Sequence, residues 1–208
     1  MPAQTKKQQQ QAKLREVINM ATTEQKLTTA DDTNKNLQME QSIIGGSELD
    51  ENTQQFLTFI LAGEEYGVDI LRVQEIKGWD AVTQVPNTPE YVRGVINLRG
   101  TIVPIIDLRI RFDMEQLAYG PTTVVIVLKV MSGNDDSRIM GIVVDGVSDV
   151  YNVKNEEIHA APDFGDGVDS SFVKGLTTVD EKMVIILDID FMLNSNELAK
   201  VNKITDEE

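Results

Sequence analysis

"GVINLRGTIVPIIDLR", residues 94–109, predicts a β-hairpin, because two apolar and largely β-branched runs are separated by only Arg99 and Gly100. A two-residue hairpin turn needs backbone in the left-handed region, which Gly100 adopts without strain. Arg99 does not meet that need. It places a long cation where turn chemistry favours Gly, Asn or Asp, so its presence calls for an explanation beyond the turn.

The same pattern returns further along the chain. Residues 91–108 match residues 172–189 at an offset of 81 (172 − 91), and residues 66–76 match 140–150 at an offset of 74 (140 − 66). Chance similarity between Val- and Ile-rich strands is the alternative. The identical pairs of the first match are Val92/Val173, Gly94/Gly175, Val103/Val184, Ile105/Ile186 and Asp107/Asp188.

Two copies of a five-stranded unit predict an all-β fold of two small barrels, since five short strands avoid exposed edges by closing on themselves. We expect the first barrel over residues 54–119 and the second over 120–188, with "AGEE" (62–65) as a four-residue loop in the first. Helical spacing of Phe191, Met192, Leu198 and Val201 predicts a short C-terminal helix. Residues 1–53 are polar and lack periodicity, which predicts a disordered tail.

Charge and composition narrow the possible partners. The 208 residues carry a net charge of −15 from 19 basic and 34 acidic side chains; residues 1–50 hold 6 and 7 of these, which leaves about −14 on the remainder (13 − 27). Such a surface repels phosphate backbones and anionic membranes and suits protein partners, although acidity can also serve solubility alone. The absence of cysteine, of a membrane-length apolar run and of a secretory signal favours a cytoplasmic protein.

The sequence gives no sign of catalysis. Its single histidine, His159, lies in a loop without a recognisable nucleophile, and "DFG" at 163–165 lacks the other motifs of a protein kinase. Its aspartates are scattered over strand ends without calcium-loop spacing. We therefore expect no enzyme, no cofactor and no metal.

Three motifs together resemble the CheW family of chemotaxis coupling proteins: "EEYGVDILRVQEI", "TPEYVRGVINLRGTIVPIIDLR" and "GIVVDGVSDV", in this order and spacing. The resemblance covers residues 54–194. It implies two intertwined five-stranded SH3-like barrels, the first completed by the C-terminal segment 189–204. It also implies a non-enzymatic adaptor that joins chemoreceptor tips to the histidine kinase CheA, in the cytoplasm at membrane-associated receptor arrays.

Carried over by position, the family's receptor-facing surface falls at Val73, Glu75, Gly94, Val147 and Val150. Each has a structural alternative: the valines as strand core, Gly94 as a bend glycine like its counterpart Gly175, and Glu75 as a solvated strand position. A kinase-facing set is not assigned. A ligand-sensing double β-barrel is the alternative function, and it would require a lined internal cavity.

The second copy of the repeat has no arginine at the equivalent turn. Residues 178–181 place Asp180 and Glu181 there instead. Arg99 is therefore not required by the fold of the unit. We expect a directional, two-pronged ion pair between Arg99 and Glu75 that shapes the partner surface. A solvated arginine that keeps a strand edge soluble is the alternative.

Overall fold

The structure of the protein is a computed structural model that describes residues 52–132, 136–162 and 171–194. Its strands are β1 (Thr53–Leu61), β2 (Glu64–Asp69), β3 (Val73–Gly78), β4 (Val92–Leu98), β5 (Thr101–Asp107), β6 (Val124–Ser132), β7 (Asp136–Val144), β8 (Gly146–Lys154), β9 (Val173–Val179) and β10 (Lys182–Leu187). The described residues also form four single-turn helices: η1 (Ile70–Arg72), α2 (Leu108–Arg111), η2 (Asn155–Glu157) and α3 (Ile189–Leu193), of which α3 follows the last strand.

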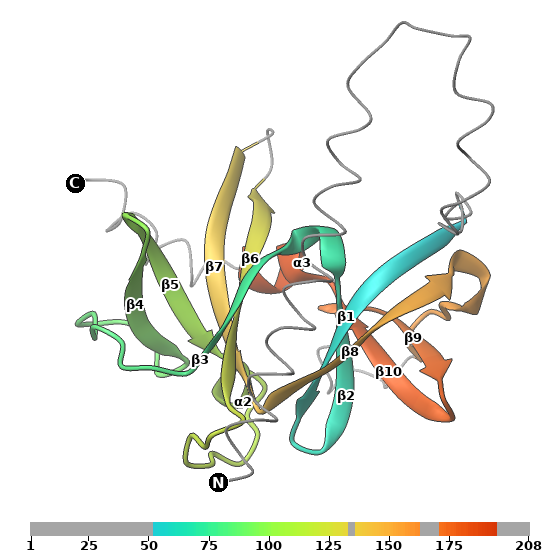
Figure 1. Ribbon diagram of the computed structural model, residues 1–208, viewed down its shortest axis with the longest axis horizontal. Coiled ribbons are helices and arrows are strands. Elements are labelled where there is room, and N and C mark those ends of the chain that lie inside the picture. The colour runs from blue at the N-terminus through green and yellow to red at the C-terminus, as the bar shows by residue number, and fades with distance from the viewer. Residues whose placement is uncertain (1–51, 133–135, 163–170, 195–208) are drawn as a thin grey trace, which may run out of the picture. The chain divides into compact units, whose positions relative to one another are not determined.

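The strands form two five-stranded sheets with the same internal order, β8-β1-β2-β10-β9 and β3-β6-β7-β5-β4 (Figure 1). In each sheet one parallel pairing joins two hairpins, and it sets Ile186 beside Gly67 in one sheet and Ile105 beside Gly141 in the other. Ile105 and Ile186 are equivalent in the sequence repeat, and so are Gly67 and Gly141. The sequence repeat therefore corresponds to a repeated five-stranded unit, and the all-β double-barrel fold is confirmed.

The division of the strands between the barrels differs from the expected 54–119 and 120–188. One barrel is continuous, β3 to β7, and is called here the central barrel; the other combines β1 and β2 with β8, β9 and β10, and is called the terminal barrel. The β1–β2 and β6–β7 hairpins occupy equivalent places, so strand pattern alone does not say which hairpin accompanies which set of strands. The barrels are interleaved because the β1–β2 hairpin lies in the later barrel.

Each barrel is closed by an irregular segment that pairs with the hairpin opposite. Thr83 and Val95 exchange two backbone hydrogen bonds of 2.9 and 2.8 Å in the central barrel. His159 and Leu176 do the same in the terminal barrel, at 2.8 and 2.7 Å. Both closures leave the first and last strands of each sheet without an open edge at these points.

The inner faces of both barrels are filled by side chains. Val103, Ile105, Val125, Val127 and Val143 pack inside the central barrel, and Phe56, Val153, Val184 and Ile186 inside the terminal one. The opposite faces of β1 and β6 are buried as well, with Leu57, Phe59, Ile126 and Leu128 fully inaccessible. Burial on both faces explains why these strands are nearly continuous apolar runs rather than alternating ones.

The structure differs from expectation at residues 62–65 and agrees with it at the C-terminal helix. The segment 62–65 is not a four-residue loop: Ala62 and Gly63 form a two-residue turn with φ of 54° and 89°, and Glu64 and Glu65 begin β2. The C-terminal helix is present as α3, which lies against β6 of the central barrel. Its expected continuation through Leu198 and Val201 lies outside the described residues, as does the tail up to residue 51.

Candidate functional site

Two strands leave one barrel and enter the other, and they carry four of the five expected receptor-facing residues. The chain passes from the terminal to the central barrel between β2 and β3, and back between β7 and β8. Figure 1 shows both crossing strands, β3 and β8, running through the middle of the view. Val73 and Glu75 lie on β3, and Val147 and Val150 on β8.

Arg99 lies at the tip of the β4–β5 hairpin with φ of 53°, followed by Gly100 at 93°. Both values match a two-residue type I′ turn, so Arg99 adopts the left-handed backbone conformation that the sequence indicated. The Asn97 side chain accepts a hydrogen bond of 2.8 Å from the Gly100 amide and so holds the turn. The left-handed position is thus supported by neighbours and not by Arg99 itself.

The expected contact between Arg99 and Glu75 is present, although it is simpler than expected. One guanidinium nitrogen, Nη2, lies 3.2 Å from Oε2 of Glu75, where a two-pronged contact was predicted. The Arg99 side chain is 85% exposed and that of Glu75 is 32% exposed. An ion pair this exposed contributes at most about 1 kcal/mol to stability. Most of the guanidinium therefore remains available to a partner.

The equivalent hairpin of the terminal barrel has the same turn geometry but different side chains. Asp180 and Glu181 adopt φ of 49° and 63°, both left-handed without a glycine. Asp180 accepts a hydrogen bond from the Tyr151 hydroxyl on β8, and partial burial, the negative charge of Asp180 and this hydrogen bond together raise the pKa of Tyr151. Each hairpin tip therefore contacts the crossing strand of its own barrel, through a cation in one case and an anion in the other.

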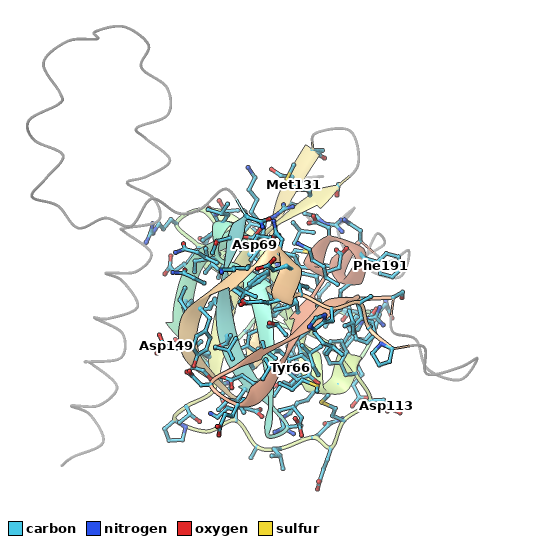
Figure 2. All side chains as sticks on the ribbon, turned by 90° about the vertical axis from the view of Figure 1, so that its right-hand side faces the viewer. Tyr66, Asp69, Asp113, Met131, Asp149 and Phe191 are labelled. Carbon is cyan, nitrogen blue, oxygen red and sulfur yellow. The ribbon has the colours of Figure 1, made fainter. Side chains whose placement is uncertain are left out.

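The expected receptor-facing residues differ in exposure. Val73 is 7% exposed and pairs with Leu128, so it belongs to the core and not to an open surface. Glu75, Val147 and Val150 are partly exposed. Asp149, between the two valines, is exposed on β8 (Figure 2). Glu75, Val147 and Val150 therefore present surface to a partner, whereas Val73 is enclosed in the core.

Gly94 is buried and serves barrel closure. Its φ is 135°, and a Cβ atom there would lie 2.2 Å from the carbonyl oxygen of Thr83, the residue that closes the central barrel. A Cβ atom at its repeat partner Gly175 would likewise lie 2.8 Å from the carbonyl oxygen of His159. This geometry favours the bend interpretation of Gly94 over direct partner contact.

Sequence reasoning missed a polar and aromatic cluster beside the central barrel. Asp107 Oδ1 caps α2 by accepting the Arg109 amide at 2.9 Å, and its Oδ2 accepts the Tyr119 hydroxyl at 2.5 Å. Trp79 lies against Tyr119, with ring centroids 4.1 Å apart. Burial, followed by the hydrogen bond to Asp107, raises the pKa of Tyr119. An aspartate directly before a helix is an N-cap signal and could have indicated this site.

His159 forms part of the barrel closure through its backbone. Within the part of the chain that the structure describes, no group of three or more His, Asp or Glu side chains is arranged to hold a metal ion. No described helix has the length and apolar character needed to cross a membrane. The "DFG" tripeptide at 163–165 lies outside the described residues.

Comparison with known proteins agrees with this architecture. The family model described as "CheW-like domain" matches residues 55–197. The chain belongs to the CheW family. A chemotaxis protein CheW from Klebsiella aerogenes is 49% identical over 151 residues, which cover 73% of this chain and 88% of that protein. A CheW from Rhizobium meliloti is 34% identical, over 69% of this chain and 90% of its own length.

A solved CheW structure supports the fold of this family member independently. The scaffolding protein TtCheW from Thermoanaerobacter tengcongensis superposes with a TM-score of 0.62 at 33% identity. The match covers 69% of this chain and 94% of that structure. The part of the chain without a counterpart in these relatives is therefore mainly the N-terminal segment, before residue 55 where the family match begins.

Proposed function

We propose that this chain is a non-enzymatic chemotaxis adaptor that couples the cytoplasmic tips of chemoreceptors to the histidine kinase CheA in signalling arrays. The observation that carries the proposal is membership of the CheW family over residues 55–197. The structural similarity to TtCheW, which is itself a scaffolding protein, supports it. The adaptor works in the cytoplasm and reaches the membrane-associated arrays by binding proteins, not the bilayer.

We place the receptor-binding surface on the crossing strands, at Glu75, Val147 and Val150, with Arg99 at its edge. Partly exposed valines provide apolar contact area, and charged groups at the rim give orientation and specificity. Val73 and Gly94 act indirectly in this proposal, by holding β3 in the core and by allowing Thr83 to close the barrel. The Arg99–Glu75 pair shapes the edge while leaving the guanidinium free to meet an acidic group of the receptor.

A charge-reversal series tests this surface. Binding of a purified receptor cytoplasmic fragment is measured for the wild type, Arg99→Glu, Glu75→Arg and the double variant. Each single variant should weaken binding at least tenfold while the thermal midpoint stays within a few degrees, because exposed charges contribute little to folding. The double variant should recover part of the loss if the pair itself matters.

Lys129→Glu is the control for Arg99→Glu, because it makes the same charge change at an exposed lysine on β6, a strand that carries none of the proposed surface residues. It should bind like the wild type. Unchanged binding by both single variants would contradict the assignment of the receptor surface. Strictly additive losses would instead mean that Arg99 contacts the receptor without help from Glu75.

A further inference from the structure

Two ion pairs join the barrels at matching places. Arg109, two residues after the capping Asp107, contacts Asp145 through Nε–Oδ1 at 2.6 Å and Nη2–Oδ2 at 2.5 Å. Asp190, two residues after the capping Asp188, contacts Arg72 at 2.8 Å. We call these contacts the α2 latch (Arg109–Asp145) and the α3 latch (Arg72–Asp190). In each latch one partner follows the last strand of a hairpin, and the other directly precedes a crossing strand.

The two latches occupy equivalent places in the fold but have opposite polarity. Arg109 and Asp190 are 81 residues apart (190 − 109), the offset of the hairpin repeat. Arg72 directly precedes β3 and Asp145 directly precedes β8. The cation is therefore on the helix in the α2 latch and on the crossover in the α3 latch.

The carboxylate has an equivalent environment in both latches despite this reversal. Asp145 Oδ2 accepts the Ala62 amide at 2.8 Å, and Asp190 Oδ1 accepts the Met131 amide at 2.7 Å. Ala62 and Met131 occupy equivalent positions in their strands. Gly67 and Gly141 are repeat partners, and they pair with Thr58 and Val127. Ala62 lies four residues after Thr58, and Met131 lies four residues after Val127. Figure 2 shows Met131 at the hairpin end of β6. The site thus accepts a carboxylate from either the helix or the crossover.

The polarity distinguishes the observed topology from the one with contiguous barrels. If β1–β5 formed one barrel and β6–β10 the other, the same strand order would bring Arg72 to Arg109 and Asp145 to Asp190. Both latches would then hold like charges. The side chains concerned are between 12% and 31% exposed, so this repulsion would be less screened than on an open surface. Apolar pattern does not separate the two topologies, but charge does.

We propose that the opposite polarity of the two latches selects the interleaved topology, by directing β3 into the central barrel and β8 into the terminal barrel. This is specificity obtained by penalising the competing arrangement. The latches also fix the points at which β3 and β8 begin. Their effect on receptor binding through Glu75, Val147 and Val150 rests on the proposed function; their effect on topology does not.

Two variants of equal composition and net charge test the proposal. Arg109→Asp with Asp190→Arg gives both latches like charges in the interleaved topology and opposite charges in the contiguous one. Adding Arg72→Asp and Asp145→Arg restores opposite charges with both latches inverted. We expect the double variant to lose at least about 5 °C of thermal midpoint, and the quadruple variant to regain at least half of it. A double variant as stable as the wild type, or a quadruple variant no more stable than the double, would overturn the proposal.

Topology is read out separately from stability. The chain has no cysteine, so spin labels at Gln74 and Lys129, exposed positions on the paired strands β3 and β6, can be introduced without removing native thiols. The double variant should lose part of the short-distance population seen in the wild type, and the quadruple variant should regain it. An unchanged distance distribution in the double variant would show that the latches do not select topology. Failure of the wild type to bind a receptor fragment would count against the proposed function alone.

Discussion

Arg99 occupies a backbone conformation that suits it poorly, and its side chain adds little to the fold. It lies at φ of 53°, its side chain is 85% exposed, and the equivalent turn of the other barrel has Asp180 in its place. A residue that costs conformational energy and adds little stability points to a role outside the fold. In the proposed function that reason is recognition of the receptor.

Arg99→Asn should therefore separate stability from binding. Asparagine is favoured at left-handed positions before glycine in such turns, so the free energy of unfolding should stay the same or rise by up to about 1 kcal/mol. Receptor affinity should fall at least tenfold. Urea unfolding and a binding titration on the same preparation check both parts. A clear loss of stability would assign Arg99 to the fold instead.

Gly94→Ala should destabilise the central barrel by roughly 2 kcal/mol or more, because the new Cβ would meet the Thr83 carbonyl and the backbone is left-handed. Gly120→Ala is the control: nothing lies within 4 Å of a Cβ there, and its cost should be within about 0.5 kcal/mol. Thermal unfolding of both variants measures the difference. Equal stability of the two would remove the closure role assigned to Gly94.

Among the elements, hairpins were predictable and their assembly was not. Alternating and β-branched runs around residues 99–100 and 180–181 predicted both hairpins, because the pattern and the turn lie within a few residues of each other. The contact between Arg99 and Glu75 followed from two motifs of one barrel. The latches join residues 36 and 118 positions apart, on segments whose barrel membership the sequence pattern leaves open, so nothing local indicated them.

The hydrogen bond between Tyr119 and Asp107 makes the stability of the folded protein depend on pH above about 10. The folded-state pKa of Tyr119 is raised, so above the ordinary tyrosine pKa of about 10 the unfolded chain loses a proton that the folded chain keeps, and stability falls as pH rises. Tyr119→Phe should cost about 1–2 kcal/mol at pH 7 and reduce the slope of stability between pH 10 and 11.5. Urea unfolding across this range measures the slope. The same slope in both proteins would mean that Tyr119 titrates normally.

For the whole molecule, the described core begins with β1 at Thr53, and the family match begins at residue 55. The polar composition of the preceding segment predicts that it contributes no core. Deletion of residues 1–50 should therefore leave the thermal midpoint within about 2 °C of the full chain. Differential scanning calorimetry of both proteins makes the comparison. A drop of many degrees would show that the segment packs on the barrels.

The repeat predicted two barrels of equal construction, whereas the interleaving depends on interactions that period-two patterns do not encode. For the residues expected to face a receptor, the sequence predicted strand positions but not exposure. Val73 and Gly94 belong to the core because β3 pairs with β6 and because the chain closes over β4. Both facts depend on the assembled barrels and not on local sequence.

The measurement that tests the central claim most directly is reconstitution of the coupling itself. An immobilised receptor cytoplasmic fragment is incubated with CheA, with and without this chain, and the retained kinase is quantified, with the Arg99→Glu variant as a matched protein control. We predict that the kinase is retained at least tenfold more when the wild-type chain is present, and that the variant loses most of this gain. Kinase retention that does not depend on the chain, or a chain that binds neither component, would contradict the account.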